Sequence, residues 1–409
     1  MRIIKDSDEE KIKLRFISSW GGIDPQAKPL NDILNEFMEN NKYVEIINES
    51  VSGDDFLTKI KVDFASGYAP DVFGLWPGSD INAMIKAGKV ADLTELLESD
   101  PDWKNSFKED AWSYTTYDGL IYGLPFERIF EGLFINKDLF EKYNIKIPED
   151  YEELKIAVIK FRAVGITPIA LNYRSEGTYL YQNILAALGG IQVKNPINEG
   201  MVKDCYVEAM KYMKELNSLS AFPSYDQAVE MDNDARDNLF LTKKAAMIAQ
   251  GSWFVGKIKE NDKTVDIIPF PKINDGVSKS PTVIHGLGCG TFYVSQNAWT
   301  NSDKNEASIR LLKALTSKKA AETFSYKSGM INNLNIDTIG LKYNDLTKKG
   351  LDLIENANEL VGPPDSYVDR TAWENIIVKK FPYVLEDKER AVDVWNEYLE
   401  NVRMRDLIE

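Results

Sequence analysis

The first hundred residues alternate between strand-like and helix-like patterns of apolar side chains. Strands are predicted at Ile12–Ser18, Val44–Val51 and Asp71–Leu75. Between them, apolar residues recur at helical spacing, at Leu30, Ile33, Leu34, Phe37 and Met38 and then at Phe56, Ile60 and Phe64. Asp54 and Ser79 are expected to cap helices. This order predicts an α/β fold built from βαβ units, with a mostly parallel sheet and helices on both of its faces.

The rest of the chain continues as a mixture of strands and helices. Asp118-Gly119 predicts the turn of a β-hairpin. Further strands are predicted at Phe130–Ile135, Pro168–Leu171, Ala245–Ala249, Val265–Phe270 and Thr291–Val294, and helices at Tyr151–Arg162, Leu180–Leu188 and Val202–Leu216. From Asn344 onward the pattern predicts an almost entirely helical tail, with one apolar face formed by Val392, Trp395, Leu399 and Val402. A chain of 409 residues is long enough for two lobes of ordinary domain size.

Two tryptophans follow predicted strands directly. Trp20-Gly21-Gly22 comes after the first strand, and Trp76 begins a turn after the third. Ligands of parallel α/β sheets bind at the carboxyl ends of the strands. Each tryptophan is therefore a candidate ligand contact, with packing in the core as the equal alternative.

The charge and cysteine content exclude several classes of protein. Lys and Arg number 49 against 64 Asp and Glu, and a net charge of −15 argues against a nucleic-acid surface. Cys205 and Cys289 are the only cysteines, too few for a disulfide framework, and are interpreted as small buried apolar side chains. No apolar run approaches the roughly 18–20 residues that span a bilayer. Met1–Lys13 is charged and lacks the apolar centre of a signal peptide, as in a cytosolic protein or a mature secreted chain.

Most catalytic and cofactor chemistry is also excluded. His285 is the only histidine, which rules out sites that need two, and no Gly-x-Ser-x-Gly elbow accompanies it. Gly251–Lys257 has the spacing of a phosphate loop, but Ile258 stands where Ser or Thr would bind Mg²⁺. Gly286–Gly290 precedes a strand rather than a helix, unlike a dinucleotide site. We expect no metal and no cofactor.

Six segments, in order, resemble a known family. They are Phe16–Gly22, Ala69–Phe73 with Trp76, Gly119–Pro125 leading into Gly132–Phe140, Gly165–Ala170, Ala246–Trp253 with Ile267–Pro271, and Glu306–Gly329. Together they are similar to the family 1 extracellular solute-binding proteins of ABC importers, the maltose-binding-protein-like group. The third segment departs slightly, because Ile135 replaces an aromatic residue.

The resemblance implies a periplasmic-binding-protein-like fold of two α/β lobes joined by hinge segments, with a ligand cleft between them. The chain would cross between lobes near residues 126–130, 280–286 and about 330. Lobe one would comprise 1–126 with 286–329, and lobe two 127–285 with 330–409. Ligand capture in such proteins is a hinge closure.

The candidate ligand residues offer the groups that sugars require, aromatic plates for stacking and charged groups for hydrogen bonds. The full set is Trp20, Trp76, Asp80, Glu127, Arg128, Glu176, Tyr179, Trp253, His285, Arg370 and Trp373. The resemblance aligns Trp76 and Trp253 with stacking tryptophans. A surface ion pair is the alternative for Glu127 with Arg128, and helix packing is the alternative for Arg370 with Trp373.

These features predict an extracytoplasmic protein that captures a mono- or oligosaccharide and delivers it to the permease subunits of an ABC importer. We expect a monomer, lipid-anchored at the cell surface in its native form. Two alternatives stay open. One is a glycoside hydrolase that uses two cleft carboxylates, and the other is the sugar-sensing subunit of a signalling system.

Overall fold

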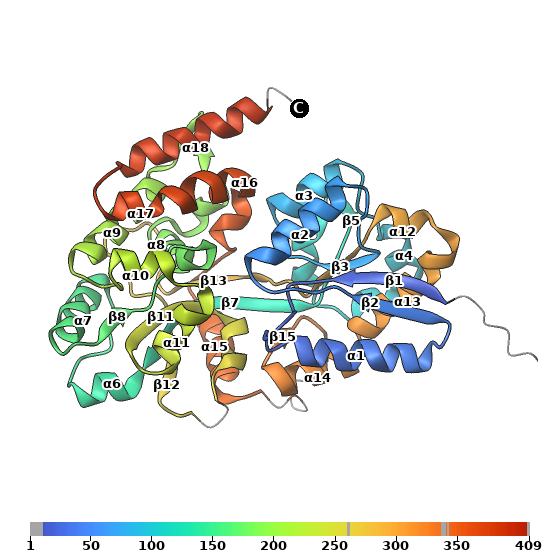
Figure 1. The fold of residues 1–409 in the computed structure, drawn as a ribbon, viewed down its shortest axis with the longest axis horizontal. Helices are drawn as coiled ribbons and strands as arrows, with labels where there is room; N and C mark the ends of the chain where they lie inside the picture. The colour runs from blue at the N-terminus through green and yellow to red at the C-terminus, as the bar shows by residue number, and fades with distance from the viewer. Residues whose placement is uncertain (1–10, 260–261, 337–340, 342, 407–409) are drawn as a thin grey trace, which may run out of the picture. The chain divides into compact units, whose positions relative to one another are not determined.

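The computed structural model describes residues 11–259, 262–336, 341 and 343–406 (Figure 1). The amino-terminal segment from Met1 therefore lies largely outside the described residues. The chain divides into two compact units: unit 1 comprises Met1–Pro77, Ile81–Arg128 and Leu287–Lys342, and unit 2 comprises Gly78–Asp80, Ile129–Gly286 and Tyr343–Glu409.

Unit 1 contains a five-stranded sheet of order β2-β1-β3-β14-β6. β1 (Ile12–Ile17) pairs in parallel with β2 (Val44–Asn48) and with β3 (Val72–Gly74), as the βαβ pattern predicts. β14 (Thr291–Val294) is antiparallel to β3 and to β6 (Leu124–Pro125). The sheet is thus mixed, because β14, which comes late in the sequence, runs antiparallel to both of its neighbours.

Helices cover both faces of this sheet (Figure 1). α1 and α14 lie on one side and α2 and α3 on the other. The helices of unit 1 are α1 (Ala27–Asn40), α2 (Asp54–Ala65), α3 (Ser79–Lys86, whose first two residues belong to unit 2), α4 (Thr94–Ser99), α5 (Pro101–Asn105), α12 (Gln296–Thr300), α13 (Ser302–Leu315) and α14 (Lys318–Ser328), with a 3-10 helix η1 at Glu109–Tyr114. The predicted cap at Asp54 is wrong, since Gly53 occupies the N-cap position and the helix begins at Asp54.

The predicted hairpin is confirmed. β4 (Thr116–Tyr117) and β5 (Leu120–Ile121) are antiparallel, and Tyr117 pairs with Leu120 across a two-residue turn. Asp118 and Gly119 have φ values of 49° and 81°, the left-handed conformations that such a turn requires.

The larger sheet has the order β16-β13-β7-β11-β8, with β12 and β15 also paired to β7. Its strands are β7 (Glu127–Asn136), β8 (Thr167–Ile169), β11 (Ala245–Gly251), β12 (Val265–Ile268), β13 (Thr282–Leu287), β15 (Ile331–Asn332) and β16 (Glu359–Val361). β11 is antiparallel to β7 and parallel to β8, and β12 is antiparallel to β7. The first two residues of β7 belong to unit 1, where they pair with β15. The larger sheet is therefore mixed, with β7 antiparallel to β11, β12 and β15.

Helices make up most of the remainder of unit 2. They are α6 (Lys137–Lys142), α7 (Tyr151–Ala163), α8 (Tyr179–Gly189), α9 (Asp204–Ser218), α10 (Tyr225–Glu230), α11 (Asn233–Leu241), α15 (Asp345–Glu355), α16 (Arg370–Ala372), a π-helix at Trp373–Val378, α17 (Lys379–Leu385) and α18 (Ala391–Asp406). Short 3-10 helices lie at Ser175–Thr178 (η2), Gly190–Lys194 (η3), Ser252–Lys257 (η4) and Pro364–Tyr367 (η6), and β9 (Ile197–Asn198) pairs with β10 (Met201–Val202). The tail is not purely helical, because β16 joins the sheet beside β13. Of the predicted face of α18, Trp395 and Leu399 are buried, but Val392 is 40% exposed.

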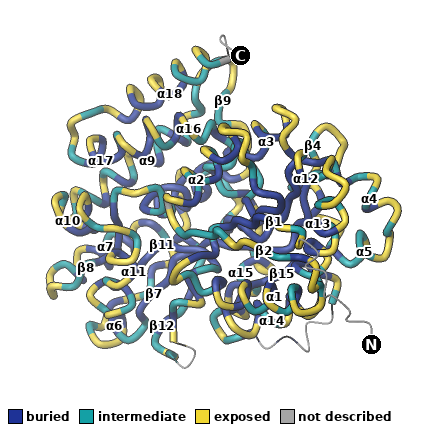
Figure 2. Tube along the Cα trace, turned by 45° about the vertical axis from the view of Figure 1, so that its right-hand side comes forward, coloured by how far each residue is buried: buried dark blue, intermediate teal, exposed yellow. Residues whose placement is uncertain are grey.

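Each unit has its own hydrophobic core. One core surrounds the sheet of unit 1, and the other packs the sheet of unit 2 against α7, α8, α9 and the carboxyl-terminal helices. Figure 2 shows buried strands and helices whose outer turns are exposed. Both cysteines are free; Cys289 is buried and Cys205 is half-buried.

Packing in the core of unit 1 leads us to expect different effects on stability from a buried and an exposed residue of α2. Ile60 of α2 is 0% exposed, whereas Val62 is 59% exposed. Ile60→Ala should lower the free energy of unfolding by about 2–5 kcal/mol, because it leaves a cavity. Val62→Ala should change it by less than about 0.5 kcal/mol. Urea unfolding of the two variants measures the difference, and equal effects would contradict this packing.

Candidate functional site

The strands place candidate aromatic residues at their ends. Trp76 follows β3 by two residues, and Trp253 follows β11 by two residues, within η4. Both residues are half-buried, so neither is fully enclosed in the core. The ring of Trp76 rests edge-on against Phe56 of α2, with centroids 5.6 Å apart.

In unit 1, Trp20 and Glu127 meet across Gly290. The backbone N–H of Gly290 donates a 2.8 Å hydrogen bond to Oε2 of Glu127. A Cβ on Gly290 would lie 2.6 Å from Cβ of Glu127 and 2.8 Å from the ring of Trp20. Only glycine fits between these two side chains.

Trp20 is nevertheless part of the core. It is 3% exposed, and its ring contacts Phe292 and Phe324 at centroid distances of 5.8 and 4.9 Å. The packing alternative is favoured for this residue, since little of its ring is left for a solute.

Glu127 has an unusual acid strength for a carboxyl group. Its side chain is buried at the start of β7, and burial raises its pKa to about 7, with the Gly290 hydrogen bond acting in the opposite direction. The nearby charge of Asp24 raises the pKa further. Glu127 is therefore a carboxyl group that changes charge near neutral pH.

Three other candidates lie in β7, α3 and β13. Arg128 is half-buried and pairs with Ile331 of β15. Asp80 is half-buried in the first turn of α3. His285 is 6% exposed within β13.

In unit 2, Tyr179 and Trp253 form an aromatic pair. Their ring centroids are 5.4 Å apart with planes inclined by 57°. The Trp253 ring folds back over Gly251, where a Cβ would lie 2.2 Å from it, so glycine is required at this position. Two aromatic faces from distant parts of the sequence thus lie together at the end of β11.

Glu176 lies in the same neighbourhood. It is in η2, directly before α8, and its Oε2 accepts a 2.7 Å hydrogen bond from Nη2 of Arg236 on α11. Its side chain keeps 27% of its surface exposed, whereas that of Arg236 keeps 2%. The charge of Glu176 also acts on Tyr179, whose pKa is raised well above the ordinary value, first by burial and then by Glu176.

Buried groups that the sequence did not single out surround this cluster. Glu131 of β7 is 2% exposed, and burial raises its pKa well above the usual range, with Asp365 adding to the shift. Nδ2 of Asn183 donates a 3.2 Å hydrogen bond to it. The only sequence signal for Arg236 is a basic residue on the apolar side of a helix in an acid-rich segment, one turn before Phe240.

Arg370 and Trp373 have different environments. Nη1 of Arg370 lies 2.5 Å from Asp365 and its Nη2 2.8 Å from Glu374, which also accepts a hydrogen bond from the Ser175 hydroxyl. Arg370 is thereby connected to η2, beside Glu176. Trp373 is 0% exposed and packs against Tyr181 and Trp395, which favours the helix-packing alternative.

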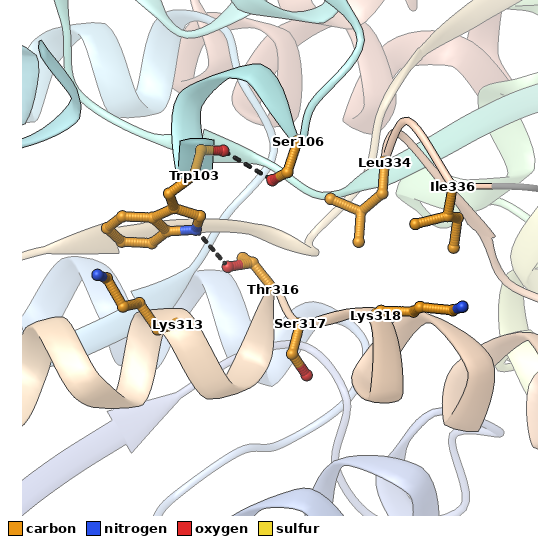
Figure 3. Close-up of a pocket in the computed structure, with 8 residues that line it drawn as sticks. All are labelled: Trp103, Ser106, Lys313, Thr316, Ser317, Lys318, Leu334 and Ile336. Carbon is orange, nitrogen blue, oxygen red and sulfur yellow. Dashed lines mark hydrogen bonds between the residues drawn. The ribbon is translucent and has the colours of Figure 1, made fainter. Parts of the chain in front are cut away.

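A cavity of about 270 Å³ lies elsewhere in unit 1 (Figure 3). It is lined by Trp103, Ser106, Lys313, Thr316, Ser317, Lys318, Leu334 and Ile336. None of these is a candidate ligand residue, so this cavity does not help to assign the site. Within the described part of the chain, no group of three or more His, Cys, Asp or Glu side chains is arranged to hold a metal ion. No helix there has the length and apolar character needed to cross a membrane.

Comparison with known proteins gives a family match over most of the chain. The model of a family described as bacterial extracellular solute-binding protein matches residues 23–322. A multiple sugar-binding protein of Streptococcus mutans is 24% identical over 336 residues, 78% of this chain and 74% of that protein. The maltodextrin-binding protein MdxE of Bacillus subtilis is 27% identical over 257 residues, 59% of this chain and 57% of that protein.

Solved structures share the fold. A chitin oligosaccharide binding protein superposes with a TM-score of 0.84 at 19% identity, covering 96% of this chain and 98% of that one. A maltose/maltodextrin-binding domain from Bdellovibrio bacteriovorus, bound to maltotriose, gives 0.77 at 18% identity, covering 96% and 99%. The prediction of a periplasmic-binding-protein-like fold is confirmed.

The raised pKa of Glu127 predicts a pH dependence of stability. Because the folded carboxyl binds its proton more tightly than the unfolded one, the folded state carries more protons between about pH 4.5 and 7. The free energy of unfolding should therefore fall as pH rises through this window. Above about pH 7 the loss reaches its full size, because Glu127 is then ionised in both states. Glu127→Gln should reduce that fall by up to about 3 kcal/mol.

Urea unfolding between pH 4.5 and 8 measures this effect. Glu98→Gln, at an exposed position of α4, controls for the removal of a carboxyl group. The interpretation fails if Glu127→Gln and Glu98→Gln give the same pH profile.

Proposed function

We propose that this chain, which belongs to the bacterial extracellular solute-binding protein family, binds a saccharide and delivers it unchanged to an ABC importer. The observation that carries the proposal is the cluster at the end of β11, where the rings of Tyr179 and Trp253 lie beside the carboxylate of Glu176. Aromatic faces stack on the C–H faces of sugar rings, and a carboxylate accepts hydrogen bonds from their hydroxyl groups.

The names of the relatives support the same class of ligand. They include a multiple sugar-binding protein and a maltodextrin-binding protein. In unit 1, Trp76 is a half-buried aromatic residue and Glu127 a buried carboxyl group, and both stay candidate ligand residues. In unit 2, Arg370 stays as well, whereas the burial of Trp20 and Trp373 makes them supporting residues.

The family supports a proposal about the protein's partners and location. We infer that the saccharide passes to the permease subunits of an importer, that the binding protein acts as a monomer, and that it works outside the cytoplasm. Two relatives named probable sugar-binding periplasmic protein, from Mesorhizobium japonicum and Rhizobium meliloti and each 23% identical, support the location. Lipid anchoring, capture by hinge closure and the lobe boundaries 1–126 with 286–329 and 127–285 with 330–409 stay predictions.

A thermal-shift and calorimetric screen tests the saccharide assignment. Maltotriose, xylotriose and chitotriose are suitable probes, together with their monosaccharides. A bound sugar at a hundredfold excess over its Kd should add about 2.7 kcal/mol to the stability. Failure of every probe to bind would refute the proposal, and a shortened sugar recovered after incubation would refute capture without catalysis.

Variants of the tryptophans test the site itself. Trp253→Ala and Trp76→Ala should each weaken binding of the responding probe by about tenfold, since each removes a stacking surface worth about 1.4 kcal/mol. Trp299→Ala, which removes a half-buried ring of α12 outside the proposed site, should leave affinity unchanged. Calorimetric titration provides the comparison, and an equal loss in all three variants would contradict the assignment.

A further inference from the structure

We propose that Arg236 is a positioning residue that holds two ligand-contacting groups, Glu176 and Trp253, in one fixed arrangement before the ligand binds. The inference rests on the proposed function for the role of those two groups. The hydrogen bonds that link Arg236 to Glu176 and, through Asp237 and Gln250, to Trp253 are called the network below. Their geometry does not depend on the proposed function.

The first arm of the network runs from Arg236 to Glu176. Nη2 of Arg236 lies 2.7 Å from Oε2 of Glu176 and 2.7 Å from Oδ1 of Asp237, and Nε lies 3.1 Å from the same Oδ1. One guanidinium therefore holds two carboxylates, one from its own helix and one from η2. Its planar arrangement of donors fixes the direction of both contacts.

The second arm runs from Asp237 to Trp253. Nε2 of Gln250 donates to Oδ1 of Asp237 at 3.2 Å, and Nε1 of Trp253 donates to Oε1 of Gln250 at 2.9 Å. The amide of Gln250 has only one orientation that satisfies both bonds, because the reversed amide would place an N–H against the indole N–H. The indole N–H of Trp253 is thus held by a chain of hydrogen bonds that begins at Arg236.

The residues of the network differ in burial: those in its middle are buried, and those at its two ends are partly exposed. Arg236, Asp237 and Gln250 are 1%, 2% and 1% exposed, whereas Glu176 and Trp253 are half-buried. Rearranging this buried network is costly, since every broken bond leaves a further charged or polar group unpaired. The partly exposed ends are the two groups that a sugar would meet. Pre-organised groups bind with a smaller loss of conformational entropy than mobile ones.

Lys257 provides a matched control on the same carboxylate. Its Nζ lies 2.7 Å from Oδ2 of Asp237, the oxygen that neither Arg236 nor Gln250 uses. Lys257→Met removes a cation from Asp237 but leaves the path from Arg236 to Trp253 intact. Gln250→Leu does the opposite, because it breaks the path to Trp253 and leaves the bonds of Arg236 in place.

The experiment is ¹⁹F NMR of the ligand-free protein labelled with 5-fluorotryptophan. The chain has eight tryptophans, and Trp253→Phe identifies the resonance of Trp253 by its loss. We expect one narrow Trp253 resonance in the wild type and in Lys257→Met. In Arg236→Met and Gln250→Leu it should move by more than its linewidth or split, while circular dichroism confirms that the variants are folded.

Binding of maltotriose, xylotriose or chitotriose supplies the second measurement. A probe that binds the wild type should bind Arg236→Met about tenfold or more weakly and Lys257→Met with little change. The positioning role is overturned if the Trp253 resonance of folded Gln250→Leu matches the wild type, or if Lys257→Met disturbs it equally. Absence of binding by the wild type would instead count against the saccharide proposal, because the NMR result does not depend on a ligand.

Discussion

A full positive charge lies inside unit 2, and the arrangement of the groups around it depends on how that charge is neutralised. Removing an ion such as the Arg236 guanidinium from water costs several kcal/mol unless partners of opposite charge replace the water. Glu176 and Asp237 supply that compensation, and Asp237 also accepts bonds from Gln250 and Lys257. Ion pairs and hydrogen bonds thereby link three segments, η2, α11 and the end of β11, in addition to their ring contacts. The aromatic pair of Tyr179 and Trp253 lies where these segments meet.

The sequence predicted well what depends on neighbours along the chain. The three parallel strands β1, β2 and β3, their intervening helices and the Asp118-Gly119 turn follow from local periodicity and backbone preference. The same local order placed Trp76 and Trp253 just beyond the ends of strands. Residues that end a strand occupy a defined edge of the sheet, so their position is decided before the remainder of the chain packs.

What depended on distant partners could not be predicted. Trp20 also follows a strand, but its ring packs against Phe292 and Phe324. These partners lie far away in the sequence, so the residues around Trp20 could not predict the contact. Trp373 is covered in the same way by Tyr181 and Trp395. The antiparallel direction of β14 and the strand β16 within a helical tail are likewise properties of tertiary pairing. Arg236 was not predicted as a site residue, because the sequence does not show which carboxylates pair with it or that it is buried.

The position of β14 in the sheet of unit 1 has a consequence for the order of events during synthesis. β14 lies between β3 and β6, yet its residues Thr291–Val294 follow β6 by more than a hundred and sixty positions. While the ribosome is still translating the segments of unit 2, β3 and β6 lack the strand that joins them. Until β14 is available, the edges of β3 and β6 that pair with it stay unpaired. Unpaired strand edges are prone to association with other chains. Vectorial folding of this protein favours completion of unit 1 only after most of unit 2 has emerged.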